Sequence, residues 1–236
     1  MEALPLLRFD DLDIQALLVI APHPDDESLG CGGMIAAACA AGVPVTVLIV
    51  SDGAGSHPNS VAYPPDRLRA LREAETLEAT AELGLAPDHV TFLRLPDRCV
   101  PSDGVQAQAA VAAMVAAAPA GPAATIAVTW PHDPHCDHQA AFALARRAHR
   151  LLPGSKLLAY PIWGLSRPPH ECIAESEIGG FRLAISEYLP AKRRAIAAHR
   201  SQTTSLIGDD PTGFRLTAQD LARFDGPSEI FLKVKP

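Results

Sequence analysis

Short apolar runs of strand length alternate with longer segments of helical periodicity along most of the chain. Buried strands are predicted at 17–21, 45–50, 90–95, 125–129, 156–163 and 182–185. Helices are predicted at 28–42, 66–83, 105–118, 139–152 and 191–199. Strands that alternate with helices indicate an α/β fold, in which helices cover both faces of a mostly parallel sheet. Ligands of such sheets bind beyond the carboxyl ends of the strands.

A charged motif, His23-Pro24-Asp25-Asp26-Glu27, directly follows the first predicted strand. His23 and Asp26 can both reach one zinc ion, because imidazole nitrogen and carboxylate oxygen are common zinc ligands. Asp25 is then the candidate general base, a carboxylate that accepts a proton from water activated by the metal. An Asp-rich turn can instead cap the following helix, so this motif alone leaves that alternative open.

A second cluster, residues 132–138, follows the fourth predicted strand and holds three histidines and two aspartates. His138 can supply the third protein ligand and leave the fourth zinc position open, as catalysis requires. His135, as imidazolium, can stabilise the oxyanion and protonate the departing amine, with Asp137 orienting its ring. Cys136 is a rival ligand that we leave out. The alternative is that these are solvated loop histidines and that Asp133 or Asp137 caps the following helix, which two clusters at equivalent strand ends disfavour.

Composition narrows the class of protein. The 236 residues fit a single domain over 1–236, and the net charge of −7 with scattered Lys and Arg excludes the footprint of a nucleic-acid binder. No apolar run reaches the roughly 18 residues that span a bilayer. The acidic start differs from a secretory signal, so we expect a cytoplasmic protein without membrane contact. Five cysteines without a CxxC pair are expected to be reduced thiols.

The sequence APHPDDE at 21–27 and the sequence PHCDH at 134–138 resemble the motifs of the PIG-L/LmbE-like family of zinc-dependent N-deacetylases. Shorter matches are RxxE at 72–75, LPD at 95–97 and HRSQ at 199–202, so the resemblance covers most of the chain. It implies a Rossmann-like three-layer sandwich and activity on N-acetylated sugars and related amides.

The resemblance implies the same site roles as the residues themselves. The expected zinc ligands are His23, Asp26 and His138. Asp25 is expected to be the base, and His135 and Asp137 the acid side of the reaction. Other divalent metals remain compatible with a site of two histidines and one aspartate.

Two further residues are expected to contact substrate on the strength of the resemblance alone. These are Arg72 and Asp97, although Arg72 can instead pair with Glu75 along its helix and Asp97 can be a turn residue. His199 either approaches the pocket or is a solvated histidine of a basic helix.

The aromatic residues of the site depend on loop positions that the sequence does not determine. Some family members carry an oxyanion-assisting tyrosine near the second motif, where this chain has Trp130-Pro131-His132-Asp133. Tyr63 or Tyr160 would substitute only if a loop brought it close, and Trp130 or Trp163 can supply a wall for a sugar ring. The loops at 57–65 and 166–177 are expected to decide substrate identity.

These observations predict a zinc-dependent hydrolase that removes an N-acetyl group from a small N-acetylated amino sugar, such as N-acetylglucosamine, or a glycoconjugate, by attack of metal-bound water. The alternatives are a metal-dependent amidase acting on a non-sugar amide or thiol conjugate, and a non-catalytic metal- or ligand-binding protein. A dinucleotide-dependent oxidoreductase is disfavoured, because residues 30–33 read G-x-G-G instead of G-x-G-x-x-G. A homo-oligomer is compatible with the sequence.

Overall fold

The computed structural model describes residues 4–121, 123–166 and 179–233. Within these residues one eight-stranded sheet has the order β1-β7-β8-β6-β5-β2-β3-β4. The strands are β1 Leu6–Leu7, β2 Leu17–Ala21, β3 Val45–Ser51, β4 Val90–Leu95, β5 Thr125–Thr129, β6 Lys156–Tyr160, β7 Gly180–Ala184 and β8 Ser228–Lys233. The α-helices are α1 Asp26–Ala40, α2 Pro65–Glu82, α3 Gly104–Ala117, α4 Cys136–Leu151, α5 Leu189–Ala198, α6 Arg200–Thr203 and α7 Ala218–Phe224. Short 3-10 helices are η1 Phe9–Asp11, η2 Pro87–His89 and η3 Trp163–Ser166.

Five neighbouring strands of the sheet, β6, β5, β2, β3 and β4, run parallel. The chain builds outward from β2 to β4 on one side and from β5 to β6 on the other, so its direction reverses between β2 and β5. Loops that leave two adjacent strands at such a reversal diverge to opposite faces and open a crevice for ligands. Both polar clusters of the sequence follow these two strands.

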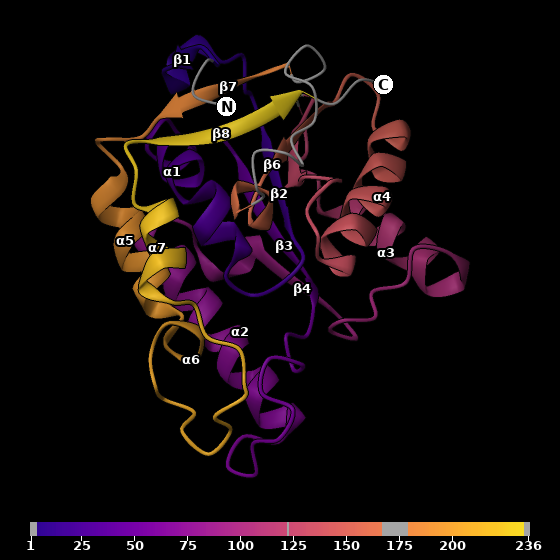
Figure 1. Ribbon diagram of the computed structural model, residues 1–236. Helices are drawn as coiled ribbons and strands as arrows, with labels where there is room; N and C mark the ends of the chain where they lie inside the picture. Colours follow the sequence, from indigo (N-terminus) through magenta and orange to yellow (C-terminus); the bar gives the residue numbers. More distant parts are fainter. Residues whose placement is uncertain (1–3, 122, 167–178, 234–236) are drawn as a thin grey trace.

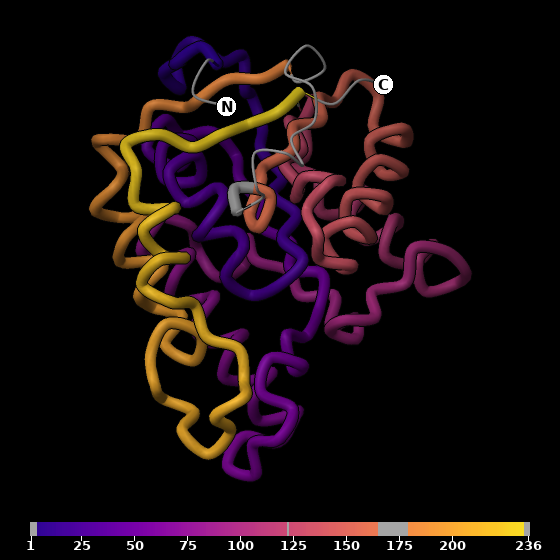
Figure 2. Tube along the Cα trace, in the orientation of Figure 1, coloured from indigo at the N-terminus to yellow at the C-terminus, as the bar shows by residue number. Residues whose placement is uncertain are grey.

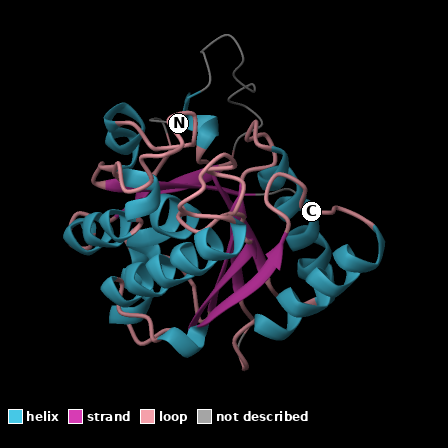
Figure 3. Cartoon of the chain, turned by 90° about the horizontal axis from the view of Figure 1, so that it is seen from below, coloured by secondary structure: helices cyan, strands magenta, loops and turns pink. Residues whose placement is uncertain are grey.

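Helices cover both faces of the sheet (Figure 1, Figure 3). Alternate residues of β2 face opposite sides: Leu17 and Val19 belong to the core with α1 and α5, whereas Leu18 and Ile20 belong to the core with α3 and α4. Burial on both faces explains the continuously apolar character of the central strands. The predicted three-layer, Rossmann-like α/β fold with a mostly parallel sheet is confirmed.

The far edge of the sheet differs from the sequence prediction. Strand β8 was not predicted, and it lies antiparallel between β6 and β7. The two-residue strand β1 and the helices α6 and α7 were also not predicted. Strand β6 ends at Tyr160, earlier than expected, because the apolar residues after it enter η3. No helix in the described part of the chain is long and apolar enough to cross a membrane.

Two loops from distant parts of the chain meet beyond the carboxyl ends of the central strands (Figure 2). The Asn59 backbone N–H donates to the Asp210 carboxylate at 2.9 Å, and the Ser60 hydroxyl donates to Asp209 at 2.8 Å. The Phe214 backbone N–H donates to the Ser56 carbonyl at 2.7 Å. These contacts place residues of the α6–α7 loop over the site.

Candidate metal and catalytic site

The turn after β2 places His23 and Asp26 side by side. The His23 backbone N–H donates to Asp26 Oδ2 at 3.1 Å, and Asp26 begins α1. The Ser51 N–H donates to the Pro22 carbonyl at 2.9 Å, which ties this turn to the end of β3. The side chains of the turn therefore emerge at the carboxyl edge of the sheet.

The second cluster begins α4. His135 is the N-cap residue of this helix, and His138 lies in its first turn with a fully buried side chain. His138 Nδ1 lies 2.9 Å from Asp133 Oδ2, which fixes the direction of the ring. The same Asp133 carboxylate accepts backbone N–H groups of Ile162 and Gly164 at the start of η3.

The structure brings the three predicted metal ligands together. Asp26 Oδ2 lies 3.2 Å from His23 Nδ1 and 3.3 Å from His138 Nε2. His138 Nε2 is buried and makes no hydrogen bond within the described residues, an arrangement that costs free energy unless a ligand occupies that nitrogen. Two imidazoles and a carboxylate suit zinc, so the residues present fit a metal ion.

The carboxylates around this cluster favour charged imidazoles. Burial lowers the pKa of His23, but Asp137, Asp26 and Asp97 outweigh this effect and raise it well above its ordinary value. Burial likewise lowers the pKa of His138, and Asp26 and Asp133 raise it overall. Burial raises the pKa of Asp26, but the histidines lower it overall. Without a metal, protons on the imidazoles neutralise the carboxylates.

Further metal-binding side chains surround the same point. Ligand atoms of His23, His135 and His138 lie within 4.8 Å of one another, as do those of His23, Asp97 and Asp137. Cys136 forms a third such group with its neighbours. Its thiol instead donates to the Arg98 carbonyl at 3.6 Å, and burial raises its pKa, which disfavours the thiolate that binds metals.

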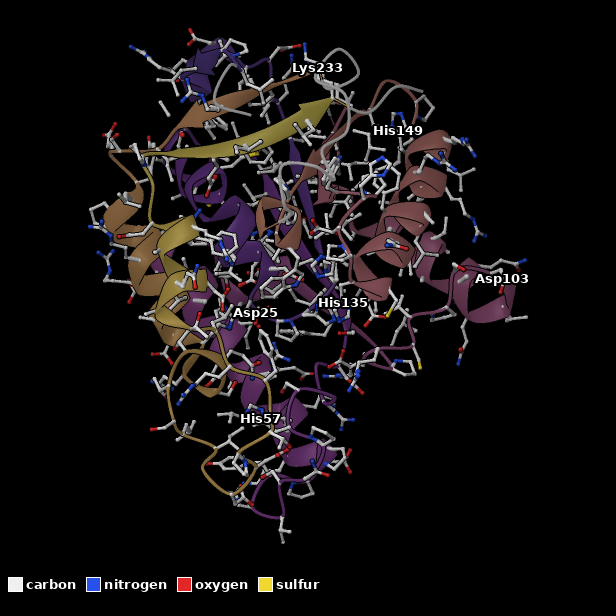
Figure 4. All side chains as sticks on the ribbon, in the orientation of Figure 1. Asp25, His57, Asp103, His135, His149 and Lys233 are labelled. Carbon is white, nitrogen blue, oxygen red and sulfur yellow. The ribbon has the colours of Figure 1, made fainter. Side chains whose placement is uncertain are left out.

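Asp25, the predicted base, has an unusual backbone conformation with φ of 147°, a region that residues with side chains rarely adopt. Its N–H donates to Glu27 Oε2 at 3.0 Å, and its Oδ2 lies 3.1 Å from Arg72 Nη2. Burial raises the pKa of Asp25 to about 6 although Arg72 opposes the shift. Figure 4 places Asp25 near His135 in the middle of the molecule.

Glu27 and His199 form a buried pair behind Asp25. Glu27 Oε1 lies 2.9 Å from His199 Nε2 and accepts the Ser28 hydroxyl at 2.7 Å. Burial lowers the pKa of His199, but Glu27 and Asp25 outweigh it and raise the pKa. His199 is therefore not a solvated histidine of a basic helix. No role was predicted for Glu27, although its place in the HPDDE motif was a signal.

His135 and Asp137 contact each other differently from the expectation. The Asp137 backbone N–H donates to His135 Nδ1 at 3.2 Å, so the His135 ring is oriented by the Asp137 backbone and not by its carboxylate. This contact holds the neutral ring with its proton on Nε2, and burial together with His23 and His138 lowers the pKa of His135. The Asp137 carboxylate lies 3.2 Å from His23 Nε2 and accepts the Arg98 and Val100 N–H groups.

The two residues expected to bind substrate are largely engaged by the protein. Arg72 donates to the carbonyls of Gly53 and Pro24 as well as to Asp25, and does not pair with Glu75 in the described residues. Asp97 Oδ1 lies 3.3 Å from His23 Nε2, and its Oδ2 accepts the Gly55 N–H at 2.9 Å. Both line the cavity, but the geometry favours support of Asp25 and His23 over direct substrate contact.

A cavity of about 760 Å³ opens onto the cluster. Its floor contains His23, Asp25, Asp26 and His135. One wall contains Trp163 and Phe214, whose rings meet edge to face with centroids 5.8 Å apart. Two tryptophans were proposed to form a wall for a sugar ring, and of these Trp163 lines the cavity.

The remaining aromatic candidates lie elsewhere. Trp130 is buried and packs against His132. Tyr160 is buried and donates its hydroxyl to the Ile20 carbonyl, and Tyr63 stacks with Arg67. The loop at 57–65 borders the cavity, whereas residues 167–177 of the other expected loop, 166–177, lie outside the described residues.

Comparisons with known proteins agree with this geometry. The family model described as PIG-L, GlcNAc-PI de-N-acetylase, matches residues 18–149. A Bacillus subtilis protein named probable N-acetyl-alpha-D-glucosaminyl L-malate deacetylase 2 is 28% identical over 199 residues, which cover 81% of this chain and 85% of that protein.

Solved structures share the fold. The conserved protein TT1542 from Thermus thermophilus is 27% identical with a TM-score of 0.64, covering 94% of this chain and 96% of that one. A triple mutant of a deacetylase of teicoplanin biosynthesis is 20% identical with a TM-score of 0.68, covering 92% of this chain and 97% of that one.

Proposed function

The chain belongs to the PIG-L family, and from this membership we propose that it is a metal-dependent hydrolase that removes the N-acetyl group from an N-acetylated amino sugar or glycoconjugate. The observation that carries the proposal is the convergence of His23, Asp26 and His138 beside Asp25 on the floor of a cavity. The Bacillus subtilis relative is named as a probable deacetylase, which supports the same class of reaction.

The proposed metal ligands are His23, Asp26 and His138. Zinc held there supplies Lewis-acid activation of water and of the acetamide carbonyl. The buried His138 Nε2 supports the assignment, because it lies 3.3 Å from Asp26 Oδ2 yet makes no hydrogen bond among the described residues, where one would otherwise be expected.

Asp25 is proposed to accept the proton of the attacking water. Its pKa of about 6 leaves it mostly ionised at neutral pH and well matched to proton transfer. Arg72 contacts the Asp25 carboxylate, and Glu27 accepts the Asp25 backbone N–H. The water oxygen bonds to the acetamide carbon as Asp25 takes the proton.

His135 is proposed to act on the other side of the carbonyl. Its Nδ1 accepts the Asp137 N–H, so Nε2 carries the proton and can donate to the developing oxyanion. The C–N bond then breaks as the departing nitrogen takes the proton that Asp25 accepted from water, which restores the Asp25 carboxylate, and acetate and a free amine leave. Trp163 and Phe214 offer apolar surface to a sugar ring.

The experiment that tests this proposal measures acetate release from N-acetylated sugars and simple amides by metal-reconstituted protein. We expect Asp25→Asn to retain the metal and lose about 10²- to 10⁴-fold in turnover, the usual contribution of a general base. We expect His23→Ala to lose both metal and turnover. Metal content is measured beside each rate.

Full turnover of metal-verified Asp25→Asn would remove Asp25 from the mechanism. Acetate from simple amides but not from sugars would redirect the proposal to a non-sugar amidase.

A further inference from the structure

Asp25 differs from a typical aspartate at the start of a helix. It is the N-cap residue of α1, but within the described residues its side chain makes no capping hydrogen bond with the first turn. Its carboxylate instead lies 3.1 Å from Arg72 Nη2 and lines the cavity. The φ of 147° therefore accompanies a carboxylate that faces the proposed reaction site and does not cap the helix.

A backbone conformation this uncommon persists only where the surrounding contacts fix it. The angle φ is the rotation about the N–Cα bond, so it is restrained when the groups on both sides of that bond are held. On one side, the Asp25 carbonyl accepts N–H groups of the first turn of α1. On the other side lies the Pro24–Asp25 peptide group. Its carbonyl accepts Arg72 Nη2 at 2.7 Å, and its N–H donates to Glu27 Oε2 at 3.0 Å.

The Glu27 carboxylate is itself held from a distant part of the chain. It is fully buried, and its Oε1 lies 2.9 Å from Nε2 of His199, a buried residue at the junction of α5 and α6. The Ser28 hydroxyl donates to the same oxygen at 2.7 Å. One oxygen of Glu27 thus faces the imidazole and the other faces the Asp25 N–H, so this carboxylate links the C-terminal helices to the backbone of the proposed base.

We propose that Glu27 and His199 are positioning residues, which together hold Asp25 in its positive-φ conformation with its carboxylate toward the cavity. Neither residue lines the cavity, so both act through Asp25 and not on the substrate. This inference rests on the proposed function, in which Asp25 is the base. The competing role for Glu27 is to stabilise only the N-terminus of α1 by its negative charge, as acidic residues of a first helical turn do.

Glu27→Gln tests this link with a side chain of the same shape. A glutamine has one acceptor oxygen, so it cannot accept from the Asp25 N–H and from His199 with separate oxygens. We expect kcat per bound zinc to fall about 10- to 100-fold, since displacing a reacting group by about 1 Å can cost 100-fold in rate. KM should stay within about twofold, because the residues that line the cavity are unchanged. The substrate is the N-acetylated sugar from which the wild-type protein releases acetate fastest.

A double-mutant cycle distinguishes positioning of Asp25 from stabilisation of α1. In the Asp25→Asn background, Glu27→Gln should lower kcat by less than about twofold, because the group on which Glu27 acts has already been removed. Losses that multiply fully in the double variant would overturn the proposal.

Two substitutions of His199 test its hydrogen bond separately from its volume. His199→Leu removes the donor to Glu27, whereas His199→Gln retains an amide N–H that can reach the same carboxylate. We expect kcat to fall about tenfold in His199→Leu and to recover most of this loss in His199→Gln. Equal kcat in the two variants would remove His199 from the proposal.

Glu229→Gln is the matched control. Glu229 is also a buried carboxylate that accepts N–H groups of α1, those of Gly33 and Met34, and it pairs with the buried Lys192. It lies on β8 and does not line the cavity, so kcat per bound zinc should stay within about twofold of the wild type. Thermal melting verifies the fold of each variant before assay. A loss of kcat as large as that of Glu27→Gln would assign the effect to the stability of α1 and overturn the proposal.

Amide hydrogen exchange at Asp25, measured by NMR, separates this inference from the proposed function because it needs no turnover. The Asp25 N–H should exchange at least about tenfold faster in His199→Leu and in Glu27→Met, which lacks the acceptor, than in the wild type and Glu229→Gln. That result would support the positioning role even if the wild type released no acetate, in which case the deacetylase proposal would fail alone. Unchanged exchange at Asp25 in both variants would overturn the positioning role whatever the turnover.

Discussion

Asp133 connects two parts of the site through one fully buried carboxylate. It contacts His138 Nδ1 and accepts backbone N–H groups of the chain that leads to Trp163. A carboxylate behind a metal-binding histidine fixes the ring and increases its basicity. The sequence allowed Asp133 only as a helix cap, because the contact with 162–164 depends on how β5 and β6 end side by side.

Removing this carboxylate is expected to weaken metal binding. Asp133→Ala should lower zinc affinity about 10- to 100-fold, the usual effect of losing such a partner. Chelator competition measures the affinity. Asp133→Asn, which keeps a hydrogen-bond acceptor, should lose less. Zinc affinity equal to wild type in folded Asp133→Ala would contradict the assigned role of His138.

Helix α1 packs against its neighbours at a distance that only glycine allows. A Cβ on Gly33 would overlap Ile185 Cγ2, and one on Gly30 would overlap the Tyr160 ring. The Glu229 carboxylate of β8 accepts the Gly33 N–H and the buried Lys192 Nζ, both at 2.7 Å. The glycines thus serve the close packing of α1 against Tyr160 and Ile185.

Alanine substitutions at Gly33 and Gly32 should distinguish the effect of packing on stability from the effect of helix propensity. Gly33→Ala is expected to lower the free energy of unfolding by about 1 to 3 kcal/mol through overpacking against Ile185. Gly32→Ala is the control, because its Cβ would approach Lys192 Cγ to 3.0 Å, a milder contact than that of Gly33 with Ile185, and alanine favours helix. Urea denaturation compares the two. A Gly33→Ala variant as stable as Gly32→Ala would disprove the packing argument.

The parallel part of the fold could be predicted because its strands are buried on both faces. Strands β2, β4 and β5 have the predicted bounds. Strand β8 could not be predicted, since its sequence SEIFLK contains a glutamate that is buried through partners on α1 and α5. The proximity of His23 and His138 could be predicted, because both follow strands whose ends lie side by side. The pairing of Glu27 with His199 could not, because it depends on helices far apart in sequence.

At the scale of the whole molecule, the apo and metal-bound proteins should respond to pH in opposite ways. The raised pKa values of His23 and His138 mean that their ion pairs stabilise the metal-free protein below about pH 6.5, the unperturbed imidazole pKa, and that this stability is lost as pH rises through the folded pKa values. Metal binding requires the neutral rings and therefore strengthens as pH rises.

The difference in Tm between zinc-saturated and chelator-treated protein is therefore expected to grow from about pH 6 to pH 8. The free energy by which zinc stabilises the fold should rise over this range by up to about 1.4 kcal/mol per pH unit for each proton displaced. Melting curves across this range measure it. Calorimetry in buffers of different ionisation enthalpy should also detect proton release on zinc binding. A Tm difference that shrinks with pH would contradict the protonated state inferred for His23.

The positive φ of Asp25 has a consequence for how this chain can change over generations. Glycine adopts such a conformation without the strain of about 1 to 3 kcal/mol that other residues bear. Selection for folding alone would therefore favour glycine at this position and yield a more stable but inactive protein. Under the proposed function, the aspartate persists only while turnover itself is selected.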